Sequence, residues 1–410
     1  METKNKISIE TFLIRLYIII IVFEGVIRYI LNLFKIPEAL YIKDFILILL
    51  IMYGIKQTKF NKKHLILFLI ISISFIISIV YVGNFAQIMF FVLKVLTPFL
   101  AGILQYNNIL ADMKNKKLFY IFCFIMTILG VYLNYFVNFP WEGLEYEIGN
   151  KTITATRQWS TLGQKRIAGF SRSSINAATQ IIILAMLIQV DKKNNRFFKL
   201  LCCTLTIGAI ALTTTKGIII TSIIFYINDF LNIEKIKKII IKILIIIMII
   251  LPIFSTVCEP IFDFLKENLE YEVYIKYFDS FKARLMGVWP ASFELLAKHG
   301  NKILGRGLGG IGASQYNFEI NLCLPADNMF VYLYVTFGVF SILIYYCIID
   351  FISKISLKNK SDYTNIIYNI LLIICSYGIV GNILEESLLC ILFGACIGFI
   401  LKNIGRKKEK

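Results

Sequence analysis

Eight basic side chains lie in two long polar segments of this 410-residue chain or at the end of an apolar run: Lys151, Arg157, Lys165, Arg166, Arg172, Lys216, Arg284 and Arg306. The planar guanidinium of arginine matches phosphate oxygens in a bidentate way, through short charge-assisted hydrogen bonds. Any one of these charges can instead pair with a nearby acid such as Glu142 or Glu294. As a set they favour a site for an anionic partner.

Two lysines differ from the rest in their surroundings. Lys94 lies in the middle of the apolar run IMFFVLKVLTPF. Burying a cation at such a depth costs roughly 3 kcal/mol or more, so Lys94 should face a wet cavity or an internal partner. Lys216 follows the break Thr213–Thr215, where free backbone amides and a cation could hold an anion together.

A carboxylate and an amide stand where the second polar segment meets an apolar run. Asp327 could take a proton from a hydroxyl group, and Asn328 could help to bind the same molecule. The alternative is that both cap a helix, since Asp and Asn satisfy the free amides of helix starts. Glu385 begins the last apolar run and is either a rival base or a cap.

The glycine-rich stretch Gly305–Gly312 contains a GxGxxG pattern. A dinucleotide site would require a preceding strand and a βαβ unit, and neither is indicated here. Two interpretations are left: a turn that lets the backbone approach a substrate, or a plain loop hinge.

The composition indicates which solvent surrounds these residues. Hydrophobic residues make up 58% of the chain and charged residues only 17%, whereas globular domains average about 25% charged. A soluble enzyme and a disordered chain are both excluded. Most of the nine cysteines lie in apolar runs, and no cysteine–histidine cluster has the spacing of a metal site.

Apolar runs that could cross a bilayer need about 20 residues each. Twelve candidates occur, at about 12–31, 40–55, 64–81, 85–104, 118–137, 174–190, 197–212, 216–231, 238–254, 327–349, 364–383 and 386–402. The sequence therefore predicts an all-α, polytopic integral membrane protein, with residues 1–410 forming a single membrane domain.

The net charge of +17 is distributed unevenly along these runs. With the N-terminus inside, 25 lysines and arginines fall in cytoplasmic segments, against three (Lys35, Lys43 and Lys216) in the short outer loops. Cytoplasmic loops of membrane proteins carry such an excess. Both termini are therefore predicted to be cytoplasmic, and the basic charge needs no nucleic acid to explain it.

Two outer segments are long, at 138–172 and 255–326. Long translocated loops commonly cover the site of a membrane enzyme. The second is expected to contain helices at about 261–278 and 281–298, the latter kinked at Pro290. Seven of the eight basic residues lie in these two segments and Lys216 lies in a short outer loop. A lipid-linked pyrophosphate is the natural anion at this side of the membrane.

Four local patterns in this region resemble one family. They are Arg166-Ile167-Ala168-Gly169-Phe170 followed by Asn176, Thr215-Lys216-Gly217, Arg284 with Trp289 followed by Gly305 and Gly307, and Asp327-Asn328 followed by Gly338. In order and spacing they resemble motifs of the O-antigen polymerase and O-antigen ligase superfamily of bacterial membrane glycosyltransferases. The resemblance covers about residues 160–340.

The resemblance implies a GT-C-like helical fold in the bacterial cytoplasmic membrane, with neither metal nor cofactor. It also implies undecaprenyl-pyrophosphate-linked oligosaccharides as donor and acceptor. Arg166, Lys216 and Arg284 would neutralise the pyrophosphate, with Arg172, Arg306 and Lys94 as further binding residues, and Asp327 would act on the acceptor hydroxyl. The family histidine is Asp327 here, which favours a polymerase over a ligase, and the family arginine is Lys216, which loses the bidentate fork.

The expected function is thus the polymerisation of repeat units into O-antigen or capsular polysaccharide, with a chain-length regulator and a flippase as candidate partners. A ligase-type transferase is the nearest alternative. A repeat-unit flippase or solute transporter is the alternative from another class, and Lys94 and Arg15 are the residues that favour it. Such a carrier should keep its outer loops short and place its cations at the membrane midplane.

Overall fold

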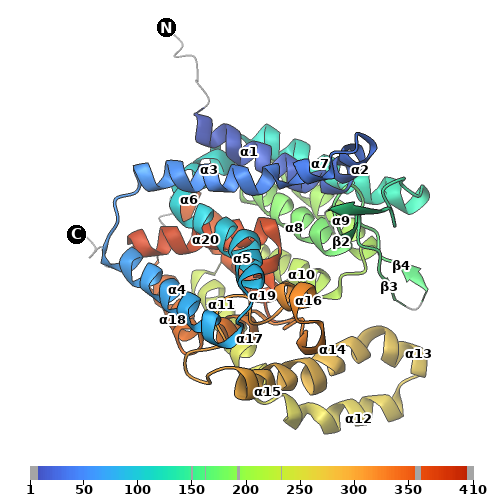
Figure 1. Ribbon diagram of the computed structural model, residues 1–410. Helices are drawn as coiled ribbons and strands as arrows, with labels where there is room; N and C mark the ends of the chain where they lie inside the picture. The colour runs from blue at the N-terminus through green and yellow to red at the C-terminus, as the bar shows by residue number, and fades with distance from the viewer. Residues whose placement is uncertain are drawn as a thin grey trace.

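The computed structural model describes residues 8–148, 151–161, 163–191, 194–231, 233–355 and 362–403, and these are mostly helical (Figure 1). The first half contains α1 (Ile9–Val22), α2 (Glu24–Leu33), α3 (Ile42–Gln57), α4 (Lys62–Tyr81), α5 (Phe85–Phe91), α6 (Thr97–Asn115), α7 (Lys117–Phe136), α8 (Ser174–Val190) and α9 (Arg196–Leu212). The second half contains α10 (Lys216–Phe230), α11 (Glu234–Ile253), α12 (Glu259–Asn268), α13 (Tyr271–Tyr274), α14 (Ser280–Ala283), α15 (Trp289–His299), α16 (Ala313–Phe318), α17 (Met329–Phe337), α18 (Phe340–Lys354), α19 (Asp362–Tyr377) and α20 (Ser387–Asn403).

Shorter helical turns join these elements. They are the 3₁₀ turns η1 (Pro37–Tyr41), η3 (Ser255–Cys258), η6 (Ile320–Leu322) and η7 (Ile383–Glu385), and the π-helical turns η2 (Val92–Leu96), η4 (Ile275–Asp279) and η5 (Arg284–Val288). The turn η2 joins α5 to α6 and contains Lys94, while η4 and η5 connect α13, α14 and α15. The segment 255–326 therefore contains helices as predicted, but the first of them, expected over 261–278, is broken between α12 and α13, and helical turns continue from α13 to α15. Pro290 lies in the first turn of α15, directly after η5.

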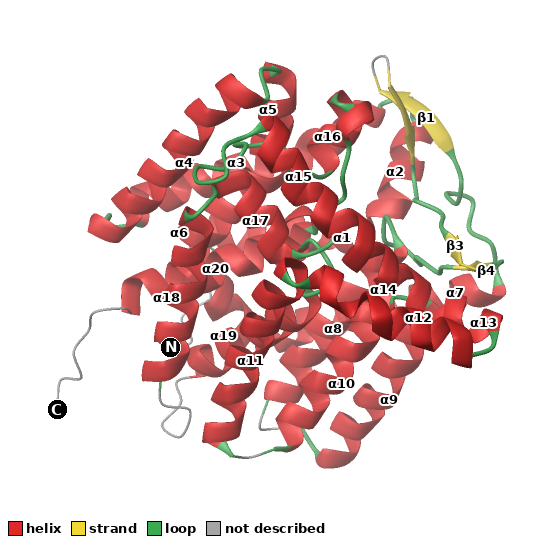
Figure 2. Cartoon of the chain, turned by 90° about the horizontal axis from the view of Figure 1, so that it is seen from below, coloured by secondary structure: helices red, strands yellow, loops and turns green. Residues whose placement is uncertain are grey.

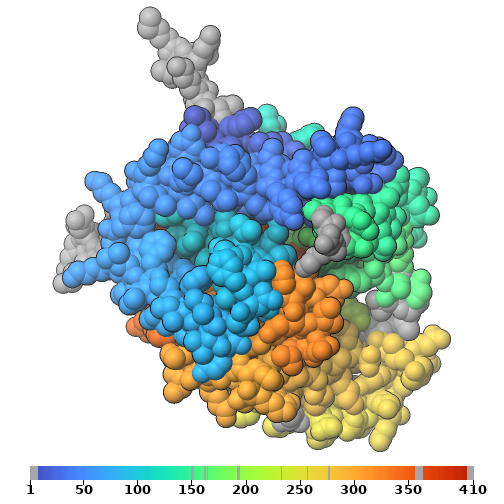
Figure 3. All heavy atoms as spheres, viewed as in Figure 1, coloured from blue at the N-terminus to red at the C-terminus, as the bar shows by residue number. Residues whose placement is uncertain are grey.

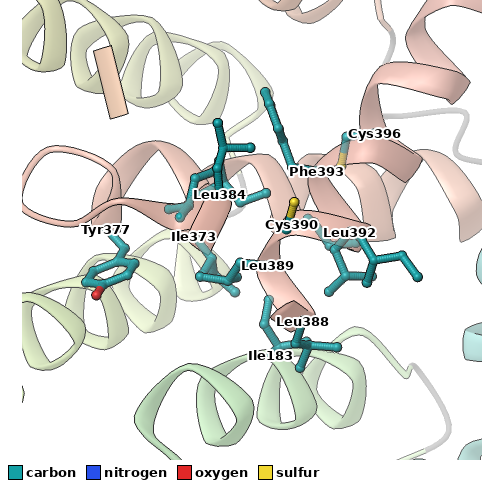
Figure 4. Packing of buried hydrophobic residues seen from close by; sticks show 14 of the residues in the cluster. Ile183, Ile373, Tyr377, Leu384, Leu388, Leu389, Cys390, Leu392, Phe393 and Cys396 are labelled. Atoms are coloured by element: carbon teal, nitrogen blue, oxygen red, sulfur yellow. The ribbon is translucent and has the colours of Figure 1, made fainter. Parts of the chain in front are cut away.

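The helices α6, α19 and α20 form the centre of the core. Figure 4 shows Leu389 and Phe393 of α20 near Ile373 of α19, and Leu388 facing Ile183 of α8, all of them buried. The Phe393 ring also packs on Phe99 of α6, with 5.6 Å between the ring centroids. Since α20 is apolar on all sides, it is a buried helix rather than an amphipathic surface one.

Only some of the helices have the length and hydropathy of a membrane span. Among the described residues, α4, the continuous stretch Phe85–Asn115 and α7 qualify, and the bent pair α1–α2 would be a fourth. The apolar helices α8, α19 and α20 have 16 or 17 residues, about 25 Å of rise. A membrane-associated, mostly helical chain is therefore supported, and the count of twelve spans stays a prediction.

Two predicted spans are interrupted in the structure. The run 12–31 bends by 82° between α1 and α2, because the helix is broken at Phe23. The run 327–349 breaks between α17 and α18 at Gly338, whose φ of 59° lies in the left-handed region that glycine adopts readily.

The mostly helical structure agrees with the all-α expectation, and the first long segment adds two short β-hairpins. There β1 (Glu145–Ile148) pairs antiparallel with β2 (Lys151–Thr154), and β3 (Ser160–Thr161) pairs with β4 (Gln164–Lys165). The period-2 alternation of the first hairpin places Tyr146 in a small cluster with Trp141 and Ala155. These hairpins and α12–α13 lie at one end of the bundle, away from α18 (Figures 1 and 2).

The glycine-rich stretch packs against protein. Gly307 has a φ of 89°, and a Cβ on it would come within 2.4 Å of the Ser78 backbone nitrogen of α4. Beyond it, α16 lies against α5 where the orange and cyan surfaces meet in Figure 3, with Phe318 and Phe90 in edge contact. The glycines of this stretch therefore allow it to pack closely against α4, whereas its approach to a substrate stays a prediction.

The predicted topology is based in part on lysines and arginines that lie outside the described residues: Lys4, Lys6, Lys192, Lys193, Lys358, Lys360, Arg406, Lys407, Lys408 and Lys410. Both chain ends also lie outside the described residues. The orientation of the chain in the membrane therefore rests on the sequence.

Candidate functional site

The first pair of candidate residues is in direct contact. Arg284 is the first residue of η5, and its Nε lies 3.0 Å from Oδ2 of Asp327. Its Nη1 donates to the carbonyl of Ser280 at 2.9 Å and to the Ser280 hydroxyl at 2.6 Å. Both side chains of the ion pair are partly exposed, at 26% for Arg284 and 33% for Asp327. The pair is thus held in place and still reachable from outside. Such π-helical turns are frequent at functional sites.

Arg166 approaches the same place from the first long segment. Its Nη2 donates to the Thr215 hydroxyl at 3.4 Å, and its guanidinium lies 5.4 Å from the centre of the Trp159 ring. Burial lowers the pKa of Arg166, Tyr377 raises it, and the charge of Arg284 lowers it further. An arginine nevertheless stays protonated. Two guanidinium groups therefore repel each other here, and an anion between them would relieve that repulsion.

A satellite cluster of aromatic rings fixes the segment that carries Arg166. Phe170 stacks on Phe139, with 5.5 Å between centroids, and Trp141 donates to the carbonyl of Gly169 at 3.1 Å. The Gly169 amide in turn donates to Asn134 Oδ1 at 3.1 Å. The residues of the Arg166–Phe170 pattern thus position the loop as well as supplying a charge.

Tyr377, at the end of α19, stands at the centre of the group. Its hydroxyl interacts electrostatically with Arg166, Arg284, Asp327 and Glu386. Its ring also lies against Gly217, where a Cβ would be 3.5 Å from Cδ2 and Cε2 of the ring. Lys216 precedes Gly217 at the start of α10, after Thr214 with a φ of 52°. Arg166, Arg284 and Asp327 are therefore grouped about one tyrosine, and the backbone next to Lys216 packs against the ring of that tyrosine.

Two consecutive glutamates border this group. Glu385 Oε1 accepts a hydrogen bond from the backbone amide of Ala313 at 2.7 Å, and Glu386 accepts one from Asn176. Burial raises the pKa of each to about 7, although the nearby Arg157 opposes the rise. Asp327 is close enough to act on Glu385. The acidic side of the site therefore titrates near neutral pH, as a coupled pair.

Arg172 belongs to a neighbouring cluster around Glu24. The Glu24 carboxylate lies 2.7 Å from Arg28, 2.9 Å from Lys43 and 4.0 Å from Arg172. Burial and the like charges of Arg28 and Arg157 lower the pKa of Arg172 to about 9. One carboxylate thus faces three cations, and Arg172 also acts on Glu386 of the candidate site. A positively charged border therefore extends from the site to this cluster.

Lys94 has an internal partner. Its Nζ lies 2.6 Å from Oδ2 of Asp44 and 5.3 Å from the centre of the Tyr41 ring. Lys94 acts on Lys43, so it adjoins the Glu24 cluster. The ion pair with Asp44 explains how Lys94 can lie in the middle of an apolar run. An internal partner was one of the two explanations that the sequence left open.

Arg306 and Asn328 have structural partners that use their polar atoms. Arg306 is 1% exposed and makes a two-pronged ion pair with Glu319, at 2.8 and 2.9 Å, as well as bonds to the carbonyls of His299 and Gly310. Asn328 caps α17 by accepting from the Val331 amide at 3.0 Å, and its amide group donates to two carbonyls. Neither residue is left free to bind a substrate in this arrangement.

We expect Arg306→Ala to lower the stability of the fold by about 3–5 kcal/mol. It removes the guanidinium that pairs with Glu319 and that donates to the carbonyls of His299 and Gly310 in a packed loop. A double variant Arg306→Met/Glu319→Leu should be much closer to the wild type, since it removes both charges. Thermal unfolding of the purified protein in detergent measures both effects. A stable Arg306→Ala protein that has lost only activity would contradict this structural role.

Sequence reasoning named most of the charged members of the site and missed Tyr377. Tyrosine occurs 22 times in the chain, and nothing local distinguishes this one. Within the described part of the chain, no group of three or more His, Cys, Asp or Glu side chains could hold a metal ion.

Comparison with known proteins adds no relative to this picture. No protein-family model, no curated protein and no solved structure matches the chain.

Proposed function

We propose that this protein is a metal-independent glycosyltransferase that polymerises oligosaccharide repeat units carried on undecaprenyl pyrophosphate. It would act at the outer face of the bacterial cytoplasmic membrane, as a chain of about twelve GT-C-like spans with both termini in the cytoplasm. The product would be O-antigen or capsular polysaccharide. The bilayer supplies both substrates, and a chain-length regulator and a flippase are the proposed partners.

The observation that carries the proposal is the grouping of Arg166, Arg284 and Asp327 around Tyr377, with the start of α10, where Lys216 lies, packed against the same ring. Arg166 and Arg284 belong to segments far apart in the sequence, and Asp327 is the carboxylate in contact with Arg284. A diphosphate ester carries negative charge, which would balance the excess positive charge of this group. Fixed cations aimed at a leaving group stabilise the charge that develops in the transition state.

In the proposed reaction, the bond between the anomeric carbon of the growing chain and its pyrophosphate breaks. The hydroxyl oxygen of a new lipid-linked repeat forms the glycosidic bond, and its proton passes to a carboxylate. Asp327 is the proposed base because it contacts Arg284 and is one-third exposed. Glu385 is the alternative, although its Oε1 already accepts from Ala313.

Reconstitution tests this function. The purified protein, in liposomes with a lipid-linked repeat and a chelator of divalent cations, should give products that lengthen by whole repeats on a gel. Transfer of finished chains to a different acceptor, without lengthening, would indicate a ligase. Movement of the lipid-linked repeat across the bilayer without any new glycosidic bond would indicate a carrier and overturn the proposal.

A further inference from the structure

An apolar cavity of about 350 Å³ opens between α4, α17, α18, α20 and the α5–α6 stretch, and none of the charged residues of the candidate site lines it. Its wall includes Ile70, Phe99, Leu343, Phe393 and Ile400. The volume falls within the range of about 300–1,000 Å³ that ligand sites occupy. Because a cavity lined by apolar groups does not hold water well, its natural occupant is a hydrocarbon.

The loose packing of α4 accounts for the cavity. Only 22% of the α4 span is buried, and Leu65, Leu69 and Ile76 on its other side are exposed. Ile66 and Ile70, one helical turn apart, line the cavity. In a bilayer, a half-detached apolar helix of this kind has lipid on its outer side, so chains can reach the cavity from the membrane.

One end of the cavity is basic. Lys63, in the first turn of α4, belongs to the lining, and its charge acts on the Cys347 thiol of α18 across the cavity. Three further lysines precede it and are exposed: Lys56, Lys59 and Lys62. Leu401, near the end of α20, lines the same end and is followed by Lys402. A hydrocarbon chain in this cavity would therefore have lysines beside its headgroup.

We propose that the cavity binds one acyl chain of an anionic phospholipid, whose phosphate lies beside Lys63 and the neighbouring lysines. The lysine-rich end is the one that the predicted topology assigns to the cytoplasm, and basic pockets between helices on that side suit anionic headgroups. A polyprenyl tail fits less well, because its pyrophosphate belongs at Arg166 and Arg284, whereas the cavity's cations are at Lys63. The choice of a phospholipid over a polyprenyl lipid rests on the proposed function, and the cytoplasmic leaflet follows from the predicted topology.

Native mass spectrometry of the whole protein in detergent tests the proposal, with phosphatidylglycerol, phosphatidylcholine and a polyprenyl phosphate as probes. The wild type should retain phosphatidylglycerol in preference to phosphatidylcholine. Lys63→Gln should reduce that preference about fivefold, the effect of one lysine near an anionic headgroup. Ile70→Trp should fill the cavity and abolish retention of phosphatidylglycerol altogether.

Two matched variants serve as controls. Leu69→Trp adds the same ring to the exposed side of α4, and Lys266→Gln removes an exposed lysine of α12; both should bind phosphatidylglycerol like the wild type. Unchanged binding in Ile70→Trp would overturn the cavity as the site. Tighter retention of the polyprenyl phosphate than of phosphatidylglycerol would overturn the occupant, and loss of polymerisation would affect neither result.

Discussion

Replacing Arg284 with alanine is expected to reduce polymer formation by about 10²–10³-fold, the usual effect of removing one group that stabilises a developing negative charge. The reason is local: Arg284 faces Arg166 and Tyr377, and its Nε is 3.0 Å from Asp327. Arg284→Lys should recover only part of the activity, because an ammonium keeps the charge and loses the planar fork. The rate of chain lengthening in liposomes is the measurement.

Arg196→Ala is the matched control, since Arg196 is exposed at the start of α9 and belongs to no part of the site. It should polymerise at the wild-type rate. Arg166→Ala should resemble Arg284→Ala, and the double variant should lose much less than the product of the two single losses, because the two residues act on one leaving group. Wild-type rates in Arg284→Ala, with the protein folded, would remove the proposed pyrophosphate site.

The sequence was most informative where hydrophobic runs or capping signals were strong. Most helices from α3 to α11 begin and end within a few residues of the predicted runs, and some start at a capping residue such as Asn61 before α4 or Asn195 before α9. The exception is the run predicted at 85–104, whose helical stretch continues to Asn115. Asn328 likewise follows the simplest expectation, that of a helix cap. Such features depend on neighbours within a few residues, which a sequence displays directly.

Features that depend on distant partners could not be predicted in the same way. Arg306 had the same appearance as Arg284 in the sequence, yet it pairs with Glu319 inside a packed loop, whereas Arg284 reaches Asp327 at a partly exposed position. The choice between the two depends on tertiary packing. The bend at Phe23 and the break at Gly338 are similar: hydropathy averages over such points, so a broken helix and a straight one give the same signal.

Glu385 and Glu386 should make the binding of substrate depend on pH. Burial raises the pKa of both to about 7, so the pair is mostly neutral in mild acid and ionises as the pH rises through 7. Ionisation adds negative charge beside Asp327, where a polyanionic substrate must bind. The KM for the lipid-linked donor should therefore rise above pH 7, and the double variant Glu385→Gln/Glu386→Gln should flatten that rise.

The raised pKa values of Glu385 and Glu386 also make the folded protein less stable as the pH rises. Both groups hold their protons more tightly in the folded protein than at their ordinary value of 4.5, so the folded state binds more protons and stability falls between pH 4.5 and about 7. The double glutamine variant should be more stable than the wild type at pH 8 and nearly equal to it at pH 4. A wild-type unfolding temperature that is flat across this range would contradict the raised pKa values.

Asp327→Asn separates the base from its rival. If Asp327 takes the proton, kcat should fall by about 10²–10⁴-fold at every pH, the usual contribution of a general base. The inflection of KM should persist but move to somewhat lower pH, because the Asp327 charge no longer raises the pKa of Glu385. Glu385→Gln should then keep a near-normal kcat and alter only the inflection. The reverse outcome, a normal kcat in Asp327→Asn and its loss in Glu385→Gln, would assign the proton to Glu385. Charge near the binding site changes the affinity for substrate and therefore KM, whereas proton transfer belongs to the chemical step and changes kcat. Comparing the two parameters in these variants therefore decides which carboxylate acts on the acceptor.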